Sequence, residues 1–419
     1  MDTITHGIVG ALAGRAFFAG QDIPASSAGG VRRHSESAPF ARAAITACTL
    51  GAIFPDIDVF AGRIARNPLA IMEWHRNITH SLVMLPVWAL LLAVVSLPLA
   101  RWVGWKPPSF AKLVGIYAFG LGTHVFLDVV TNFGTMVWSP LNYSRVAWDW
   151  LFIIDLGFSG MALLPQMAAW CYRDPGKFAW RAGATLAGLT AGAFGAYALA
   201  AAAGYGFPAW VIAVSSALMA AILFVPAMQG IGFRWRRASW CRVGMAALCA
   251  YVAFAAVAHR QALAYAKDFA ASHHLRVETL AALPLPPTLT HWVGVVTTPE
   301  GVWRTTFHVP GDGNPERTQL YADSGSDRYV AEAEQLRDVQ VYLWFARFPI
   351  WQVTQHEGQT VADVTDVRFF RGEDIEGSDD PQQPKRFTGM RTPAAGFTFE
   401  VVFDAAGRVI SHGFKRPEP

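Results

Sequence analysis

Charged residues are scarce in this sequence, and cysteines are scarcer. Only 16% of the 419 residues are charged, the net charge is +3, and we expect no nucleic-acid partner. The four cysteines, at positions 48, 171, 241 and 249, form no CxxC pair and fall in or beside apolar runs, which argues for packing roles and against a disulfide framework. Hydrophobic residues make up 53% of the chain and gather in long uncharged runs. This is the composition of an integral membrane protein.

The uncharged runs are candidates for membrane-spanning helices, each of which needs roughly 20 residues to cross about 30 Å of hydrocarbon. Three of them are long and uninterrupted, at 82–100, 182–203 and 207–229. Shorter or more polar runs complete a predicted set of eight, at 3–19, 43–60, 113–130, 151–172 and 243–258. The first run begins "MDTITHGIVGALAG", without the basic segment of a signal peptide, so we expect it to be a retained helix.

The character of the chain changes after residue 259. Short alternating stretches such as "HWVGVVTTPEGVWRTTFHV" predict hairpins that turn at 299–301 and 405–407, and "SDRYVAEAEQLRD" predicts one helix with Ser326 as its N-cap. The Pro-rich segment "LAALPLPPTL" indicates a stiff boundary. We therefore predict a mainly α fold, with a polytopic membrane domain of about eight helices at 1–259, a linker at 260–289 and a soluble β-rich domain at 290–419.

Basic residues predict the orientation of the chain, because loops rich in arginine and lysine stay in the cytoplasm. The loops 20–42, 101–112, 173–181 and 230–242 each carry three or four such residues. Both chain ends then lie outside, which in the inner membrane of a bacterium places the β-rich domain in the periplasm. The loop 61–80, which carries Arg63, Arg66 and Arg76, is an exception that requires its own explanation.

Ionisable residues converge on the outer ends of the first four predicted helices. They are His6, then Asp56 and Asp58 in "FPDIDVF", His75 and His80 in "HRNITHS", and His124 and Asp128 in "HVFLD". Such groups are costly in or beside a membrane span unless they are paired or bind a metal ion, and imidazoles and carboxylates are ligands of divalent metals. We predict that the ligand atoms of His6, Asp56, His80, His124 and Asp128 gather within about 6 Å of a common point.

Purely structural roles remain possible for some of these residues, as alternatives to metal or substrate binding. The spacing of His124 and Asp128 places both on one helical face, but it also fits a buried histidine capped by a carboxylate. Asp155 either joins the polar site or pairs with a neighbouring helix. Arg145 is the only basic residue in the loop 131–149, which suits a phosphate contact and equally suits an arginine at the membrane interface.

The chain also resembles a known family at these residues. The segments "MDTITHGIVGALAG", "FPDIDVF", "HRNITHS", "GTHVFLDVVTNFGT", "WSPL" and "DWLFIID" are similar, in order and spacing, to the YdjM-like (DUF457) inner-membrane metal-dependent hydrolases over roughly 1–160. That family is in turn similar in motif order to the zinc phospholipase C and P1 nuclease group. The resemblance implies zinc ligands at His6, Asp56, His80, His124 and Asp128, with Asp128 able to bridge two ions. The later H-x-x-x-E motif of that group has no counterpart here, so one or two ions are expected, with Asp58, His75 or Asp155 as further ligands.

A metal-dependent hydrolase, acting as a phosphoesterase on a lipid or lipid-linked substrate at the outer membrane surface, is therefore the expected function. Arg76 and Arg145 are the candidate phosphate contacts, and that role would explain the arginines of the loop 61–80. Two alternatives remain. A non-catalytic scaffold would use the metal to hold the helices together, and an ion-coupled transporter would use the same residues as an ion path.

Overall fold

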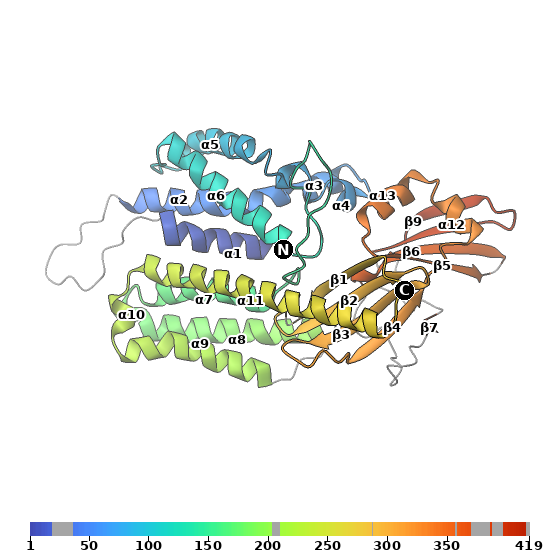
Figure 1. Ribbon diagram of the computed structural model, residues 1–419. Coiled ribbons are helices and arrows are strands. Elements are labelled where there is room, and N and C mark those ends of the chain that lie inside the picture. Colours follow the sequence, from blue (N-terminus) through green and yellow to red (C-terminus); the bar gives the residue numbers. More distant parts are fainter. Residues whose placement is uncertain are drawn as a thin grey trace. The chain divides into compact units, whose positions relative to one another are not determined.

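The computed structural model describes residues 1–18, 37–202, 210–286, 288–356, 358–369, 386–387 and 397–415 (Figure 1). Its contacts divide the chain into two compact units. The first comprises Met1–Asp58, Arg76–Trp148 and Ile153–Ala253 and is helical. The second comprises Val59–His75, Asp149–Phe152 and Phe254–Pro419 and contains both β-sheets. The predicted fold class, a helical membrane part followed by a β-rich part, is confirmed.

The helices of the first unit follow the predicted spans. They are α1 (Thr3–Ala13), η1 (Gly14–Phe18), α2 (Ser37–Ile53), η2 (Phe54–Asp56), η3 (Ile78–His80), α5 (Leu85–Trp102), α6 (Phe110–Val129), α7 (Leu156–Cys171), η4 (Pro175–Lys177), α8 (Phe178–Ala202), α9 (Trp210–Met228), α10 (Ile231–Arg234) and the first part of α11 (Arg237–Ser272). Within the described residues, five helices are long and apolar enough to cross a membrane: Phe40–Ile64, Leu85–Trp102, Phe110–Val129, Trp210–Met228 and Arg237–Ser272. Helices α1 and α7, with 11 and 16 residues, are shorter than a full span.

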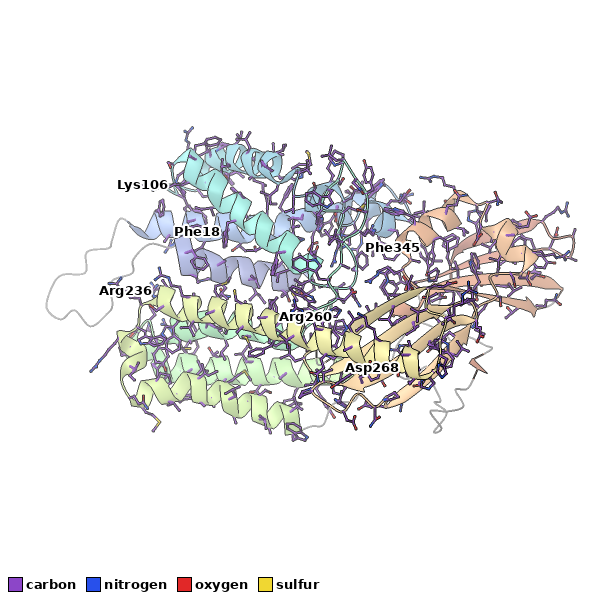
Figure 2. The ribbon with its side chains drawn as sticks, in the orientation of Figure 1. Phe18, Lys106, Arg236, Arg260, Asp268 and Phe345 are labelled. Carbon is purple, nitrogen blue, oxygen red and sulfur yellow. The ribbon has the colours of Figure 1, made fainter. Side chains whose placement is uncertain are left out.

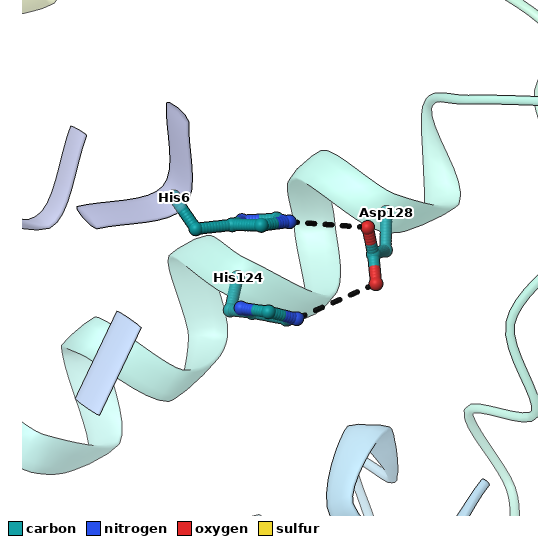
Figure 3. A group of neighbouring side chains, drawn as sticks. All are labelled: His6, His124 and Asp128. Atoms are coloured by element: carbon teal, nitrogen blue, oxygen red, sulfur yellow. Dashed lines mark hydrogen bonds and ion pairs between the residues drawn. The ribbon is translucent and has the colours of Figure 1, made fainter. Parts of the chain in front are cut away.

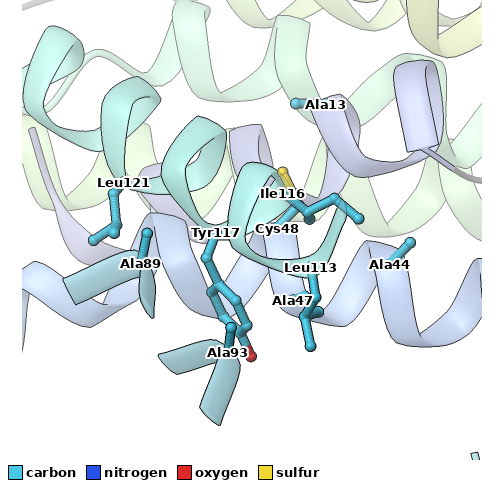
Figure 4. Close-up of a cluster of buried hydrophobic side chains, with 10 residues drawn as sticks. All are labelled: Ala13, Ala44, Ala47, Cys48, Ala89, Ala93, Leu113, Ile116, Tyr117 and Leu121. Atoms are coloured by element: carbon cyan, nitrogen blue, oxygen red, sulfur yellow. The ribbon is translucent and has the colours of Figure 1, made fainter. Parts of the chain in front are cut away.

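Small residues let α1, α2 and α6 approach one another closely. A Cβ atom on Gly120 of α6 would overlap the backbone carbonyl of Cys48 on α2, and one on Gly10 of α1 would overlap the side chain of Ala52. Around these contacts lies a core of small and aliphatic side chains that includes Cys48, Leu113 and other residues drawn in Figure 4. Close backbone approach of this kind is how membrane helices gain packing energy when the lipid is as apolar as their side chains.

The second unit contains two sheets. The larger has the order β1–β2–β3–β4–β7 and is antiparallel except for the β4–β7 pair; the smaller has the antiparallel order β5–β6–β8–β9. The strands are β1 (Thr279–Leu285), β2 (His291–Thr298), β3 (Gly301–His308), β4 (Arg317–Ala322), β5 (Pro349–His356), β6 (Gln359–Asp366), β7 (Arg386–Phe387), β8 (Thr398–Phe403) and β9 (Val409–Phe414). The short helices are α3 (Ile57–Ile64), whose first two residues belong to the first unit, α4 (Ala70–Glu73), α12 (Arg328–Ala333), α13 (Arg337–Phe345) and η5 (Val367–Phe369).

Two predicted features of this unit are confirmed and two are corrected. The hairpins turn where expected, between β2 and β3 and between β8 and β9. The N-cap of α12 is Asp327, whose carboxylate accepts a hydrogen bond from the Tyr329 amide, and not Ser326. The segment 260–289 is not a linker, because it contains the end of α11 and strand β1, whose Pro284 is tolerated on an edge strand.

The extension of α11 beyond the predicted end of its span, at 258, has a packing reason. Figure 2 shows Arg260 and Asp268 on this extension. Its apolar residues Ala266, Phe269 and Ala270 pack against Val296, Trp303, Phe307 and Leu320 of the larger sheet. One face of the extension is therefore buried by the sheet, and the charged residues occupy the rest, as expected for an amphipathic helix.

A substitution pair in α6 tests the close helix packing. Gly120→Ala should lower the free energy of unfolding by about 1–3 kcal/mol, because the new methyl group must displace the backbone of α2. Gly115→Ala is the matched control, because no atom lies within 4 Å of the position of its Cβ. Thermal unfolding of both variants in detergent should show a lower midpoint for Gly120→Ala only. Equal midpoints would contradict the tight α2–α6 contact.

Candidate metal centre

The first unit brings the predicted ligands together from four short segments. His6 lies near the start of α1, Asp56 ends η2, His80 ends η3, and His124 and Asp128 lie in the last turns of α6. All five side chains are buried. Their ligand atoms form two overlapping groups, His6 with His124 and Asp128, and Asp56 with His80 and His124, each with all atoms within 4.8 Å of one another. Each group has the residue types and spacing to hold a metal ion.

Four atoms lie closest to a common point. The Nε2 atom of His80 is 3.5 Å from Asp56 Oδ1 and 3.2 Å from Asp128 Oδ2. The Nε2 atom of His124 is 3.5 Å from the same oxygen of Asp56 and 3.4 Å from the same oxygen of Asp128. Two imidazole nitrogens and two carboxylate oxygens therefore face one another across similar distances.

The tautomer of His124 shows why this arrangement suits a cation. Its Nδ1 atom lies 2.6 Å from the backbone carbonyl oxygen of Ala52, which can only accept, so Nδ1 carries the hydrogen. The Nε2 atom of the neutral ring then presents a lone pair to two carboxylates. Neither His124 Nε2 nor Asp128 Oδ2 makes a hydrogen bond within the described residues, although both are fully buried. Buried acceptors that face one another are costly unless a positive ion lies between them.

Asp58 orients His80. Its Oδ2 atom is 3.2 Å from His80 Nδ1 and accepts a hydrogen bond of 2.9 Å from the Thr79 hydroxyl. A carboxylate on the far nitrogen of a ligating histidine fixes the ring and raises its basicity. Asp58, predicted as a ligand, thus lies on the opposite side of the His80 ring from Asp56 and Asp128.

His6 and Asp128 define a second side of the cluster, drawn with His124 in Figure 3. The His6 ring stacks on the His124 ring with centroids 3.6 Å apart, and its Nε2 atom is 3.2 Å from Asp128 Oδ1. The same oxygen accepts an ion pair of 3.0 Å from Arg76 Nη2 and contacts the amino group of Met1. The two oxygens of Asp128 therefore have different surroundings: Oδ2 faces His80 and His124, whereas Oδ1 faces His6, Arg76 and Met1.

The two predicted phosphate contacts have different exposures. Arg76 is buried, and its Nη1 atom donates to the Thr131 hydroxyl at 2.9 Å and to the Asp128 carbonyl at 3.3 Å. Arg145 is half-buried and donates to the Gly134 carbonyl at 3.0 Å. Both guanidinium groups contact the ring of Phe133, at 4.7 Å for Arg76 and 6.0 Å for Arg145. Arg76 therefore acts on Asp128, and Arg145 is the more accessible cation.

Two further candidates, His75 and Asp155, are not among the five ligands described above. His75 is half-buried and ends the segment Val59–His75 of the second unit. Asp155 caps α7 through the Phe158 amide and accepts a hydrogen bond of 2.8 Å from Tyr251 on α11, so it pairs with a neighbouring helix. All four cysteines are free, and all but Cys249 are buried.

Sequence reasoning missed the hydroxyl groups around the cluster. Thr3 donates to Asp56 Oδ2 at 2.5 Å, and Thr79 and Thr131 hold Asp58 and Arg76 in place. Each threonine lies within three residues of a predicted site residue. This proximity is a usable signal, because such short side chains supply the outer hydrogen bonds of many metal sites.

The pKa of His80 predicts how metal binding depends on pH. Burial alone would lower this pKa, but the carboxylates of Asp128, Asp56 and Asp58 raise it to about 10. Below that pH a proton occupies the ring in the absence of an ion, and a bound ion must displace it. We expect zinc affinity, measured by competition with a chelating dye, to rise about tenfold per pH unit between about pH 6 and 8. An affinity that is independent of pH would contradict a role for His80 as a ligand.

Comparison with known proteins finds a family match for the part of the chain that contains this cluster. No curated protein and no solved structure matches the chain. The YdjM inner membrane protein family matches residues 1–207, which include every residue of the cluster. The first 207 residues of this membrane protein, which has several apolar helices, are thus similar to the YdjM inner membrane protein family.

Proposed function

We propose that the chain is a membrane-bound, metal-dependent hydrolase that cleaves a phosphoester of a lipid or lipid-linked substrate. The observation that carries this proposal is the pair of buried acceptors, His124 Nε2 and Asp128 Oδ2, which lie 3.4 Å apart without a hydrogen bond. A purely structural contact would place a hydrogen atom between them. A bound cation satisfies both atoms at once.

The spacing of the four central atoms favours zinc and a single ion. Ligands at 2.0–2.1 Å from a tetrahedral ion are separated by about 3.3–3.4 Å, because the edge of a tetrahedron is about 1.6 times the centre-to-corner distance. The four separations given above range from 3.2 to 3.5 Å. The donor set of two imidazoles and two carboxylates also suits zinc. The guanidinium group of Arg76, which pairs with Asp128 Oδ1, disfavours a second ion on that oxygen.

Each residue of the site has a separate role in the proposed hydrolysis. Zinc held by His80, His124, Asp56 and Asp128 would take a water molecule as a fifth ligand, lower the pKa of that water toward about 7 and polarise the bond to be cleaved. Arg76 fixes the position of Asp128 through its ion pair with Oδ1. Asp58 orients His80, and the Ala52 carbonyl orients His124. Arg145 supplies an accessible guanidinium group for phosphate oxygens, beside Arg76 on the ring of Phe133.

The surroundings of Arg145 support a substrate at the lipid interface. The segment around it exposes large apolar side chains, namely Trp138, Leu141, Tyr143 and Trp148. Exposed tryptophan and tyrosine side chains are typical of the level at which lipid headgroups meet the hydrocarbon. A phosphate at this level belongs to a molecule whose tails lie in the membrane.

Replacement of one ligand separates the proposed enzyme from a metal-stapled scaffold. His124→Ala should abolish bound zinc and activity while the protein stays in the membrane, because the substitution makes α6 more apolar and does not impair insertion. Metal content, membrane abundance and hydrolysis of bis(p-nitrophenyl) phosphate and of phospholipids, with and without chelator, should be measured on the same preparations.

The matched control is His274→Asn, an exposed histidine outside the cluster, at a position of positive φ that asparagine tolerates. This variant should keep both metal and activity. A His124→Ala protein that retains metal and full activity would overturn the proposed site. The scaffold would be supported by a different result. The wild type would then have no hydrolytic activity, and His124→Ala would lose its metal and melt far below the wild type.

The proposed orientation has a separate test. From the basic loops we expect both termini and the β-rich part to be periplasmic in the bacterial inner membrane, although Arg32 and Arg33, which contribute to this expectation, lie outside the described residues. Alkaline phosphatase fused after residue 275 should be active, and green fluorescent protein fused there should be dark. The opposite pattern would move the metal centre to the cytoplasmic leaflet.

A further inference from the structure

A second polar site lies among the helices of the first unit. A cavity of about 510 Å³ opens between η1, α2, the end of α7 and the start of α11. It is lined by four arginines, Arg15, Arg42, Arg173 and Arg237, and by Gln166 and Trp170, among other residues. Its volume is in the range of pockets that bind small molecules, which is about 300–1,000 Å³.

This cavity lies at the opposite end of the helices from the metal centre. Along α1 and η1, Arg15 follows His6 by nine residues, about 13 Å at the rise of a helix. Along α2 and η2, Arg42 precedes Asp56 by 14 residues, about 21 Å. The cavity is thus distinct from the proposed catalytic site, and the inference drawn from it does not depend on the proposed function.

The charge of the cavity is of one sign. Four arginines line it and no acidic residue does, within the part of the chain that the structure describes. Like charges gathered around one space repel one another, and an anion in that space relieves the repulsion. The nearest acid in sequence, Asp174, caps η4 by accepting a hydrogen bond from the Gly176 amide. The cavity therefore favours a ligand with negative charge.

Arg15 is held in a fixed position at the inner wall. The Gln166 side chain, which is buried, donates through Nε2 to the carbonyls of Ile8 and Ala162, so its Oε1 atom must face the other way and accept. That oxygen accepts a hydrogen bond of 2.5 Å from Arg15 Nη1. Arg15 also lies in a π-helical turn, a local geometry that is frequent at functional sites. The guanidinium is therefore preorganised, which lowers the cost of binding a ligand.

The rest of the wall suits a molecule at the membrane interface. Ile45, Met167 and Ala169 supply an apolar side. Trp170, which is partly exposed, contacts Trp180 edge to face, and Arg181 lies over its ring. Basic pockets between membrane helices, flanked by tryptophan, bind the headgroups of anionic lipids.

We infer that this arginine cavity binds a phosphate group, either in the headgroup of an anionic phospholipid or as free phosphate. Guanidinium groups match the geometry of phosphate oxygens and form charge-assisted hydrogen bonds with them. A phospholipid would place its phosphate among the arginines and its acyl chains beside the apolar wall. Free phosphate would use the arginines alone.

The test uses the full chain purified in detergent and exchanged into nanodiscs or buffer. The probes are phosphatidylglycerol, phosphatidylcholine and inorganic phosphate, with binding followed by native mass spectrometry and by the shift in thermal midpoint. The variant is Arg42→Gln with Arg173→Gln, because both side chains are exposed and their removal leaves the packed Arg15–Gln166 contact intact. The matched control is Arg101→Gln with Lys106→Gln, two exposed basic residues outside the cavity.

We expect phosphatidylglycerol to bind in preference to phosphatidylcholine, and the Arg42/Arg173 variant to bind it about tenfold more weakly for each arginine removed. The control should change affinity less than twofold. If millimolar inorganic phosphate displaces phosphatidylglycerol, the site is assigned to free phosphate. If it does not, the site is assigned to the lipid headgroup. Equal loss of affinity in the variant and the control, or no binding of either phosphate source, would overturn the inference.

Discussion

The structure depends on one electrostatic constraint: two buried carboxylate oxygens, one from Asp56 and one from Asp128, each lie within 3.5 Å of the same two imidazole nitrogens. Asp56 and Asp128 cannot lie this close in an apolar surrounding without positive charge between or beside them. A cation at this point would join the ends of η2, η3 and α6 in a single site. Arg76 places a positive charge beside the other oxygen of Asp128, and this charge offsets part of the negative charge of the two carboxylates.

Helix packing makes the constraint possible. The Ala52 carbonyl can fix the tautomer of His124 only because Gly120, one turn earlier on α6, lets that helix approach α2 closely. The same helices carry the arginine cavity at their other ends. The family match over residues 1–207 covers Arg15, Arg42 and Arg173 of that cavity as well as the cluster. One compact set of helices thus carries the proposed cation site at one end and the proposed anion site at the other.

The sequence predicted the cluster because its signal is local and chemical. His6, Asp56, His80, His124 and Asp128 stand out among apolar residues, and the alternation of basic loops placed them on one side. Tertiary contacts determined what the sequence did not show. The partner of Asp155 is a tyrosine 96 residues away, and α11 continues past its apolar part because a sheet covers it. The basic cavity was missed because Arg42, Arg173 and Arg237 come from loops that were used only to assign orientation, and Arg15 lies within the first predicted span.

The most direct test of this account is X-ray absorption spectroscopy on the purified protein, at the absorption edge of whichever metal elemental analysis identifies. The account predicts zinc with four protein nitrogen and oxygen neighbours at about 2.0–2.1 Å, two of them with the outer-shell scattering of imidazole rings, and one further oxygen from water. The same measurement on His124→Ala protein should show no bound zinc. Sulfur neighbours at about 2.3 Å, or a protein without stoichiometric metal, would contradict it.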